Sequence, residues 1–325
     1  MDSQTIFHIQ TQAEFNSAAL AIFKFQYENN TVYQEFCNYL KKTPKKVREL
    51  HDIPFLPIEF FKSKQLISST KKPEALFTSS GTTGSKTSTH YVTDLQVYKE
   101  SYQKAFEQFY GPISEYGVLA LLPSYLEREG SSLIYMVDDL IKKSNYPDSG
   151  FYLDEIDSLK NKLIELDTSG TKTLLIGVSF ALLDFVEQHK LQLKNTVVME
   201  TGGMKGRRKE LIREELHTLL KKGFGVENIH SEYGMTELLS QAYSYGNGVF
   251  KTPPWMKVFT RDTEDPLSIQ ESKKTGGLNI IDLANLNSCA FIATQDLGKV
   301  YDDGSFEVLG RYDNSDIRGC NLMVF

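Results

Sequence analysis

The sequence predicts an α/β protein whose main part is a largely parallel β-sheet covered by helices on both faces. Helix-like and strand-like segments alternate through residues 95–233, which is the pattern of a parallel sheet with helical crossovers. After Val249 the helical pattern stops, and short strands follow, separated by Pro, Gly and Asp-Gly. We therefore expect a smaller β subdomain packed on the α/β part.

The first 75 residues have a helical pattern with breaks. Apolar side chains recur at helical spacing in residues 13–29 and 31–40, and Cys37 belongs to this apolar set, so we expect it in the core. Pro54 and Pro57 then exclude a helix interior and favour extended backbone. This part of the chain is expected to be an extended segment pinned to the protein body by its large apolar side chains.

The alternating region divides into elements by its periodicity and its end signals. Leu95 opens a helix that Asp94 can cap and that Gly111 ends. Further helices are expected at residues 131–142, 180–189 and 206–222, and strands at 116–122, 173–178, 196–199, 226–233, 255–260, 277–282, 290–294 and 306–309. The expected domains are a helical segment at 1–75, an α/β core at 76–248 and a β-rich subdomain with a short tail at 249–325.

The composition is that of an ordinary soluble globular protein. The 325 residues are 40% hydrophobic and 24% charged, and the net charge of −6 argues against nucleic acid as a partner. We expect no signal peptide and no membrane span, because no apolar run is long enough. The three cysteines lack paired spacing, which favours reduced thiols and a cytoplasmic location. No His/Cys cluster has zinc spacing, so no structural metal is expected.

The stretch Phe77–Lys86 contains six hydroxyl side chains and two glycines. Such a segment has almost nothing to bury, whereas its glycines allow successive backbone N–H groups to converge on an anion. The hydroxyl groups add donors, and Lys86 can add a point charge. We interpret the stretch as a polyphosphate cradle. Considered alone, the stretch has a flexible Ser/Gly linker as its less favoured alternative.

Three polar turns are expected at the carboxyl ends of strands, where ligands gather in open α/β sheets. Residues 200–205 hold two glycines that would let the backbone approach a planar base. Residues 232–237 offer an aromatic ring, a hydroxyl group and Glu237, which is suited to Mg²⁺ beside a polyphosphate; a solvated residue in the first turn of a helix is the alternative. Residues 294–298 place Asp296 just past a strand, where it could accept hydrogen bonds from ribose. Each turn alone is a weak signal, and their order carries the argument.

In this order the motifs resemble the adenylate-forming superfamily, over about residues 75 to 320. They are Thr78–Gly84, Tyr233–Glu237, Thr294–Gly298 and Gly310–Asp313. Three further stretches are similar to the acyl-protein synthetases of bacterial bioluminescence operons, with phenylacetate–CoA ligases as the next relatives. These stretches are Ile53–Pro57, Pro123–Ser132 and Arg318–Cys320.

The resemblance implies the large N-terminal domain of an adenylate-forming enzyme, and ATP-dependent activation of a carboxylic acid. The acid would attack the α-phosphate of ATP and give an acyl-adenylate and pyrophosphate. The residues implied at the nucleotide are Ser79, Ser80, Gly81, Thr82, Thr83 and Gly84 for the β- and γ-phosphates, Gly202, Gly203, Tyr233 and Gly234 around the adenine, Thr236 at the α-phosphate, Glu237 at Mg²⁺, Asp296 at the ribose, and Arg311 at the ribose or the adenylate phosphate. Charge neutralisation and in-line positioning are the physical basis of such a displacement.

Two features depart from the general superfamily. Its C-terminal lid, which carries a catalytic lysine, is expected to be absent because Phe325 follows the hinge-like Gly310–Asp313 closely. The acyl-protein synthetases also end early and carry a cysteine that accepts the acyl group, and Cys320 matches that position; an inert free cysteine is the alternative. The lysine that assists the nucleotide is open, since Lys86 and Lys205 are both candidates.

The leading hypothesis is therefore an AMP-forming acid–thiol ligase that passes a fatty or other acid to Cys320. A partner protein, by family analogy an acyl reductase, would then receive the acyl group. A ligase for CoA or a carrier protein, and a catalytically silent nucleotide-binding protein, are the rivals. The identity of the acid is open, and its pocket is expected at Pro54–Phe61, the strand ends and the Tyr233 turn.

Overall fold

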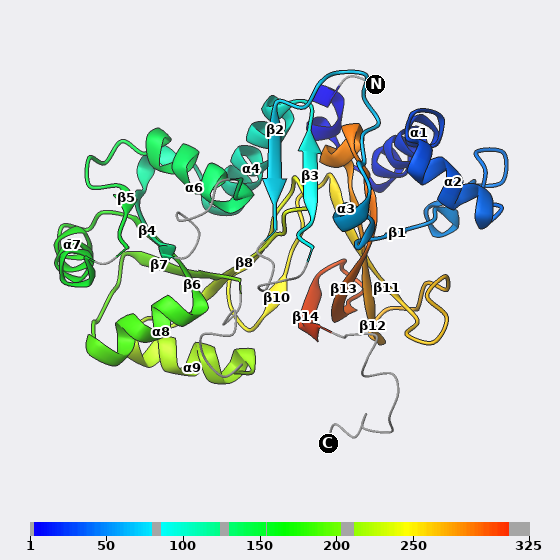
Figure 1. The fold of residues 1–325 in the computed structure, drawn as a ribbon. Helices are drawn as coiled ribbons and strands as arrows, with labels where there is room; N and C mark the ends of the chain where they lie inside the picture. The colour runs from blue at the N-terminus through cyan, green and yellow to red at the C-terminus, as the bar shows by residue number, and fades with distance from the viewer. Residues whose placement is uncertain (1–2, 80–85, 124–129, 154, 203–210, 312–325) are drawn as a thin grey trace.

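The computed structural model describes residues 3–79, 86–123, 130–153, 155–202 and 211–311. These residues form two six-stranded sheets and a two-stranded hairpin (Figure 1). We call the sheet of β4 to β9 the central sheet, and the sheet of β1 and β10 to β14 the C-terminal sheet. In Figure 1 the hairpin of β2 and β3 stands between the helices of the central sheet and the C-terminal sheet.

The central sheet has the strand order β5-β4-β6-β7-β8-β9, and every neighbouring pair is parallel except β8 with β9. Helices α4 and α6 cover one face and helices α8 and α9 cover the other (Figure 1). The prediction of a mainly parallel sheet covered on both faces is confirmed. The elements are α4 (Leu95–Tyr110), β4 (Gly117–Leu121), α6 (Ser132–Lys143), β5 (Gly150–Phe151), α7 (Ile156–Thr168), β6 (Thr173–Val178), α8 (Ser179–Gln188), β7 (Thr196–Thr201), α9 (Arg213–Phe224), β8 (His230–Tyr233) and β9 (Ala242–Ser244).

Two interior strands of the central sheet, β4 and β6, explain why the sequence contains uninterrupted apolar runs. Every residue of β4 and β6 is buried, because helices exclude water from both faces of a parallel sheet. The helix ends also follow their sequence signals. Asp94 accepts a hydrogen bond from the backbone N–H of Gln96, Gly111 ends α4 with φ of +87°, and Ser131 caps α6.

The C-terminal sheet has the strand order β10-β14-β13-β12-β11, and β1 pairs with β13 in parallel. Its strands are β1 (Leu56–Pro57), β10 (Val249–Phe250), β11 (Met256–Arg261), β12 (Thr275–Asp282), β13 (Phe291–Val300) and β14 (Phe306–Arg311). The backbone N–H of Ile58 donates to the carbonyl of Ala293 over 3.0 Å, which prolongs the β1 pairing. The proline segment is extended and pinned to the body at Leu56–Pro57, as expected, but it does not stay extended, because Phe60–Ser63 forms a helical turn.

The N-terminal helices α1 (Gln12–Asn29) and α2 (Thr31–Tyr39) pack on the C-terminal sheet. The rings of Phe23 and Tyr33 contact Phe291, and the Gln26 side chain donates to the carbonyl groups of Asn285 and Leu286. Cys37 is fully buried on α2, as expected. The remaining elements are η1 (Ser3–His8), η2 (Leu50–Asp52), α3 (Phe60–Ser63), β2 (Ala75–Thr78), β3 (Thr89–Val92), η3 (Ile113–Glu115) and η4 (Leu283–Asn287).

The structure corrects the prediction of a turn at residues 294–298. These residues lie inside β13, and the register shifts between Leu297 and Gly298. Thr294 and Asp296 point inward along the strand, alternating with the less buried Gln295 and Leu297. The inward-facing Asp296 and the glycine at the register shift, Gly298, give this part of the strand the composition of a turn.

Two other predicted boundaries are wrong. The helix expected at residues 206–222 begins only at Arg213 and runs to Phe224; the Ile212 side chain is exposed, and residues 206–210 lie outside the described ones. The strand expected to start at Val226 begins at His230. Helix α7 has no counterpart in the sequence prediction. Within the described ranges, no helix is both long and apolar enough to cross a membrane.

We predict that Phe291→Ala lowers the free energy of unfolding by about 3–5 kcal/mol, because the change leaves a cavity between α1, α2 and the C-terminal sheet. Urea denaturation followed by circular dichroism measures the loss. Tyr39→Ala is the matched control, since the Tyr39 side chain is 86% exposed, and it should change stability by less than about 0.5 kcal/mol. Equal losses for the two variants would contradict this packing.

Candidate active site

The hydroxyl-rich stretch forms the connection of the β2–β3 hairpin. Beyond the last strand pair, Thr78 with Thr89, the backbone N–H of Ser79 donates to the carbonyl of Ser88 over 3.1 Å. The N–H of Ser88 in turn donates to the Ser79 hydroxyl over 2.9 Å. Lys86 is exposed near the end of this connection. The predicted residues Ser80, Gly81, Thr82, Thr83 and Gly84 lie outside the described part of the chain.

Glu237 lies at the base of this connection. Its side chain is 6% exposed and forms a hydrogen bond with Ser88. Burial raises the pKa of Glu237, while the Ser88 contact and the positive charges of Arg311 and Lys62 act in the opposite direction. A carboxyl group that was predicted as a cation ligand thus contacts Ser88, at the described end of the hairpin connection.

His90 on β3 fixes the hairpin to the Tyr233–Glu237 motif. Its Nδ1 lies 2.9 Å from the carbonyl oxygen of Thr236, and its Nε2 lies 2.8 Å from the Ser288 hydroxyl. Burial lowers the pKa of His90 to about 4, so the ring is neutral at pH 7. Because a carbonyl only accepts, Nδ1 carries the proton and Nε2 accepts from Ser288. With both nitrogens occupied, His90 serves as a link between segments.

Tyr233, Asp296 and Arg311 form a chain of polar contacts between the two sheets. The Tyr233 hydroxyl donates to one carboxylate oxygen of Asp296 over 2.7 Å, and Arg311 Nε lies 3.3 Å from the other. The Tyr233 ring meets Phe250 and Phe306 edge-on, with centroids 5.8 and 5.5 Å away. Three predicted nucleotide-binding residues from distant parts of the sequence therefore lie in contact.

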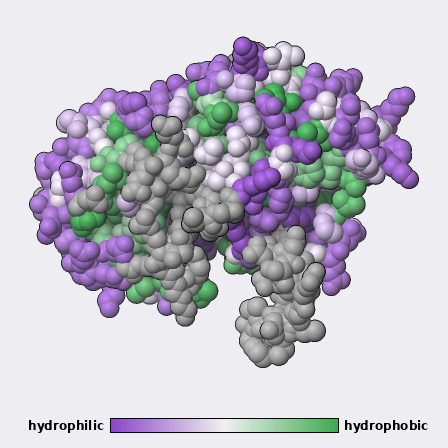
Figure 2. Space-filling model, viewed as in Figure 1, coloured by the Kyte–Doolittle hydropathy of each residue, from purple (hydrophilic) through white to green (hydrophobic). Residues whose placement is uncertain are grey.

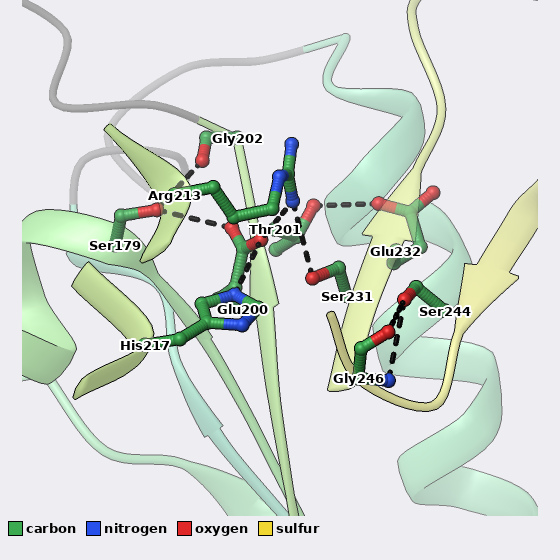
Figure 3. Close-up of polar contacts among 10 residues, drawn as sticks. All are labelled: Ser179, Glu200, Thr201, Gly202, Arg213, His217, Ser231, Glu232, Ser244 and Gly246. Carbon is green, nitrogen blue, oxygen red and sulfur yellow. Dashed lines mark hydrogen bonds and ion pairs between the residues drawn. The ribbon is translucent and has the colours of Figure 1, made fainter. Parts of the chain in front are cut away.

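A buried ionic network lies on the α8–α9 side of the central sheet, and sequence reasoning missed it (Figure 3). Arg213, the first residue of α9, donates to Glu200 over 2.6 Å and to the Ser231 hydroxyl over 3.2 Å. His217 Nε2 lies 3.6 Å from Glu200. Burial acts to raise the pKa of Glu200, but the His217 and Arg213 contacts outweigh it and lower the pKa. The sequence signal was a glutamate directly after the apolar run of β7.

The network continues to the predicted glycine turn after β7. The Ser179 hydroxyl donates to the carbonyl of Gly202 over 2.8 Å and to Glu200 over 3.1 Å (Figure 3). Gly202 has φ of +68°, a conformation that favours glycine. Since β7 and β8 are parallel neighbours, Gly202 follows β7 at the same sheet edge where Tyr233 ends β8. Gly203 and Lys205 lie outside the described residues.

Glu232 lies on the face of β8 opposite to that of Ser231. Its position explains why the Tyr233–Glu237 motif has a glycine at position 234. The Thr201 hydroxyl donates to Glu232 over 2.5 Å, and burial raises the pKa of Glu232 to about 7. A Cβ atom on Gly234 would lie 2.4 Å from a Glu232 carboxylate oxygen. A side chain at position 234 would therefore displace a buried carboxyl group.

The structure gathers most of the described predicted residues at the junction of the hairpin and the two sheets. Ser79, Thr236 and Glu237 lie around the base of the β2–β3 hairpin, where Ser88 and His90 contact them. The Tyr233–Asp296–Arg311 chain adjoins them, since the charge of Arg311 acts on Glu237. Figure 2 shows the molecule from the same side as Figure 1, with hydrophilic residues over much of the surface of the described part of the chain. Among the described side chains, no group of three His, Cys, Asp or Glu residues could hold a metal ion. Cys320 lies outside the described residues.

Comparison with known proteins agrees with the resemblance drawn from the motifs. The family model described as acyl-protein synthetase, LuxE, matches residues 5–106. The long-chain-fatty-acid–luciferin-component ligase of Vibrio harveyi is 25% identical over an alignment of 357 positions, gaps included. The alignment covers 97% of this chain and 89% of the relative. The resemblance to acyl-protein synthetases is confirmed.

Solved structures show the same fold. ATP-bound MatB from Rhodopseudomonas palustris superposes with a TM-score of 0.53 at 16% identity, over 73% of this chain and 48% of MatB. A 2-hydroxyisobutyryl-CoA ligase with its acyl-adenylate and CoA gives a TM-score of 0.65 at 10% identity, over 94% of this chain and 72% of that one. The chain spans about half the length of MatB. The predicted α/β fold of adenylate-forming enzymes is confirmed.

We predict that Glu232→Gln makes the protein's stability less sensitive to a rise in pH from about 4.5 to about 7. Because the folded-state pKa of Glu232 is raised from 4.5 to about 7, the folded protein binds this proton more tightly than the unfolded chain does. The free energy of unfolding therefore falls as the pH rises from about 4.5 to about 7. Glutamine keeps the oxygen that accepts from Thr201 and cannot titrate.

Urea denaturation at pH 5 and pH 8 measures the effect. Relative to wild type, Glu232→Gln should gain up to about 3 kcal/mol between the two pH values. Glu227→Gln, an exposed residue, should show no such gain. A gain equal to that of the Glu227→Gln control would contradict the assigned burial effect.

Proposed function

We propose that this chain, which resembles the acyl-protein synthetases along almost its whole length, activates a carboxylic acid with ATP and transfers the acyl group to a thiol. The observation that carries the proposal is the position of Glu237 between the hydroxyl-rich hairpin connection and the Tyr233–Asp296–Arg311 chain. A polyphosphate on one side and a ribose on the other would suit this layout. The similarity to acyl-protein synthetases supports the same reaction.

In the first step a carboxylate oxygen of the acid attacks the α-phosphorus of ATP. A new P–O bond forms, the bond between the α-phosphorus and its bridging oxygen breaks, and pyrophosphate leaves with the electron pair. The hairpin connection would hold the β- and γ-phosphates, Thr236 would contact the α-phosphate, and Asp296 would accept from the ribose hydroxyl groups. Arg311, held against Asp296, would place its charge beside the adenylate.

Glu237 would hold the Mg²⁺ ion that accompanies ATP. Burial raises the pKa of this carboxyl group, so its anionic form lacks sufficient compensating charge in the protein alone. A divalent cation supplies that charge, and magnesium usually takes one or two carboxylates together with phosphate oxygens and water. When bound, the ion neutralises the phosphate charge that opposes attack by an anionic carboxylate.

Cys320 is proposed as the acceptor in the second step. Its thiolate would attack the carbonyl carbon of the mixed anhydride, forming a thioester and releasing AMP. The other two cysteines are unsuited, because burial raises the pKa of both Cys37 and Cys289 to about 12. The assignment of Cys320 rests on the resemblance and on this contrast. We further propose a fatty acid as substrate, an acyl reductase as the receiving protein, and action in the cytoplasm.

We predict that Glu237→Gln lowers ATP–pyrophosphate exchange by about 100-fold or more, because it removes the proposed carboxylate contact to the cation. Exchange is measured across a panel of straight-chain, branched and aromatic acids with Mg²⁺ present. Glu227→Gln, an exposed glutamate, should exchange at the wild-type rate. No exchange by the wild-type protein with any acid would refute the proposed adenylation.

We predict that a labelled acid, ATP and Mg²⁺ give a hydroxylamine-labile label on the protein that is lost in Cys320→Ser. Exchange should persist in that variant, since adenylation precedes thiol attack. Cys289→Ser is the control and should keep the label. A label that survives in Cys320→Ser would exclude this acceptor, and thioester formed on added CoA at full rate in the variant would establish a CoA ligase instead.

A further inference from the structure

The connection between β8 and β9, residues 234–241, carries Thr236 and Glu237 of the candidate active site. Inside this connection the backbone N–H of Leu238 donates to the carbonyl of Met235 over 3.0 Å and closes a turn. Side chains from distant parts of the sequence bind further backbone groups of the connection. A buried loop needs such partners, because its N–H and C=O groups do not reach water. The position of Glu237 therefore depends on these side chains.

Asp282, at the end of β12, fixes the second half of the connection. One of its carboxylate oxygens accepts from the backbone N–H groups of Leu239 and Ser240 over 2.8 and 3.0 Å. The other accepts from the Ser240 hydroxyl group over 2.6 Å. Asp282 is fully buried, so its carboxyl group needs these donors in place of water. The segment just after Glu237 is thereby attached to the C-terminal sheet.

Asn285 binds Glu237 itself. Its side chain is fully buried on η4, and its Nδ2 donates to the carbonyl of Glu237 over 2.7 Å and to that of Cys289 over 3.1 Å. His90 holds the preceding carbonyl, that of Thr236, from the hairpin. With two successive carbonyl groups bound, the backbone at Glu237 is fixed, and its carboxyl group can move only through side-chain rotamers. The amide group of Asn285 thus helps to determine where the carboxylate lies.

The N-terminal helix α1 anchors Asn285 in turn. Gln26 on this helix is fully buried, and its Nε2 donates to the carbonyl groups of Asn285 and Leu286, each over 2.9 Å. Its Oε1 accepts from the backbone N–H of Ala290 over 3.0 Å. The Gln26 amide group is therefore used on both sides and holds η4 against α1. Two side-chain amides in sequence connect α1 to Glu237.

We propose that Asn285 is a positioning residue, which holds the Glu237 carboxylate where it can bind the Mg²⁺ ion that accompanies ATP. The inference rests on the proposed function, since the role of Glu237 belongs to it. Groups that orient a metal-binding side chain contribute to metal affinity although they never touch the ion. Loss of the Asn285 donor should therefore weaken the binding of the cation and leave the contacts of the nucleotide itself unchanged. A residue that only stabilised the fold would lower the free energy of unfolding without changing the dependence on Mg²⁺.

The test compares wild type with Asn285→Leu, which keeps a similar side-chain volume and removes the donor. Asn285→Ala, which adds no side-chain atoms, is a second variant. Isothermal titration measures ATP binding by each full-length protein with and without Mg²⁺. In both variants the gain in ATP affinity that Mg²⁺ confers should fall by about 10-fold, and the affinity for ATP without Mg²⁺ should equal that of wild type. Leu159→Ala is the control for lost stability, because Leu159 is fully buried on α7, and it should keep the whole gain.

A double variant shows whether Asn285 acts through Glu237. Glu237→Gln alone should also reduce the gain from Mg²⁺, because it removes the proposed carboxylate contact. Adding Asn285→Leu to Glu237→Gln should then change the gain by less than about 2-fold, since the group that Asn285 positions is already missing. An undiminished further loss in this background would overturn the assignment, as would a full gain in Asn285→Leu alone.

ATP–pyrophosphate exchange separates this inference from the function on which it rests. If Mg²⁺ raises the ATP affinity of wild type and raises that of Asn285→Leu less, but no acid supports exchange, the Asn285 assignment stands and the adenylation fails. If wild type catalyses exchange and Asn285→Leu keeps the full gain from Mg²⁺, only the Asn285 assignment fails. If Mg²⁺ adds nothing to the ATP affinity of wild type, the proposed roles of Glu237 and Asn285 are both overturned.

Discussion

The hydrogen bond from Tyr233 to Asp296 is the contact on which the candidate site depends. It joins the end of β8 in the central sheet to β13 in the C-terminal sheet. Asp296 is almost fully buried, and a buried carboxylate without donors is strongly unfavourable. Tyr233 and Arg311 supply one donor to each carboxylate oxygen. This contact therefore fixes the two sheets relative to each other at the point where the proposed ribose and phosphate contacts lie.

The carboxyl groups near the strand ends divide into those that the protein neutralises and those that it leaves in need of charge. Glu200 has Arg213 and His217 beside it, and its pKa is lowered despite burial. Glu232 accepts a hydrogen bond from the Thr201 hydroxyl, and burial raises its pKa to about 7. Burial also raises the pKa of Glu237, against the positive charges of Arg311 and Lys62, whose side chains are exposed. Glu237 therefore differs from Glu232 in that positively charged side chains act on it.

The sequence predicted those parts of the fold that local patterns determine. Strands β4, β6 and β7 of the central sheet were visible because burial on both faces demands unbroken apolar runs, as in β6, whereas β5 and β9 were not predicted. The limits of α4 were visible because a capping aspartate and a glycine act within one turn. The turns after β7 and β8 could be placed at strand ends because apolar runs precede them, whereas their assignment to a nucleotide came from the resemblance to a known family.

The sequence could not show how those motifs are held together. His90 is 146 residues from Thr236, and Tyr233 is 63 residues from Asp296, so neither bond leaves a periodic signal. Asp296 was assigned to a turn because an inward polar residue inside a strand breaks the expected apolar alternation. The ion pair between Arg213 and Glu200 was missed because such a pair is recognised only once both partners are placed in space.

The two cations near Glu237 come from opposite ends of the chain and differ in how free they are to act. Arg311 belongs to β14 and faces Asp296, so part of its charge is already used to stabilise a carboxylate. Lys62 belongs to a helical turn whose neighbours, Glu59 and Phe61, are held by Gln295 and His90. The Glu237 carboxyl group is thus affected by two positive charges, one held against a buried carboxylate and the other on an exposed side chain.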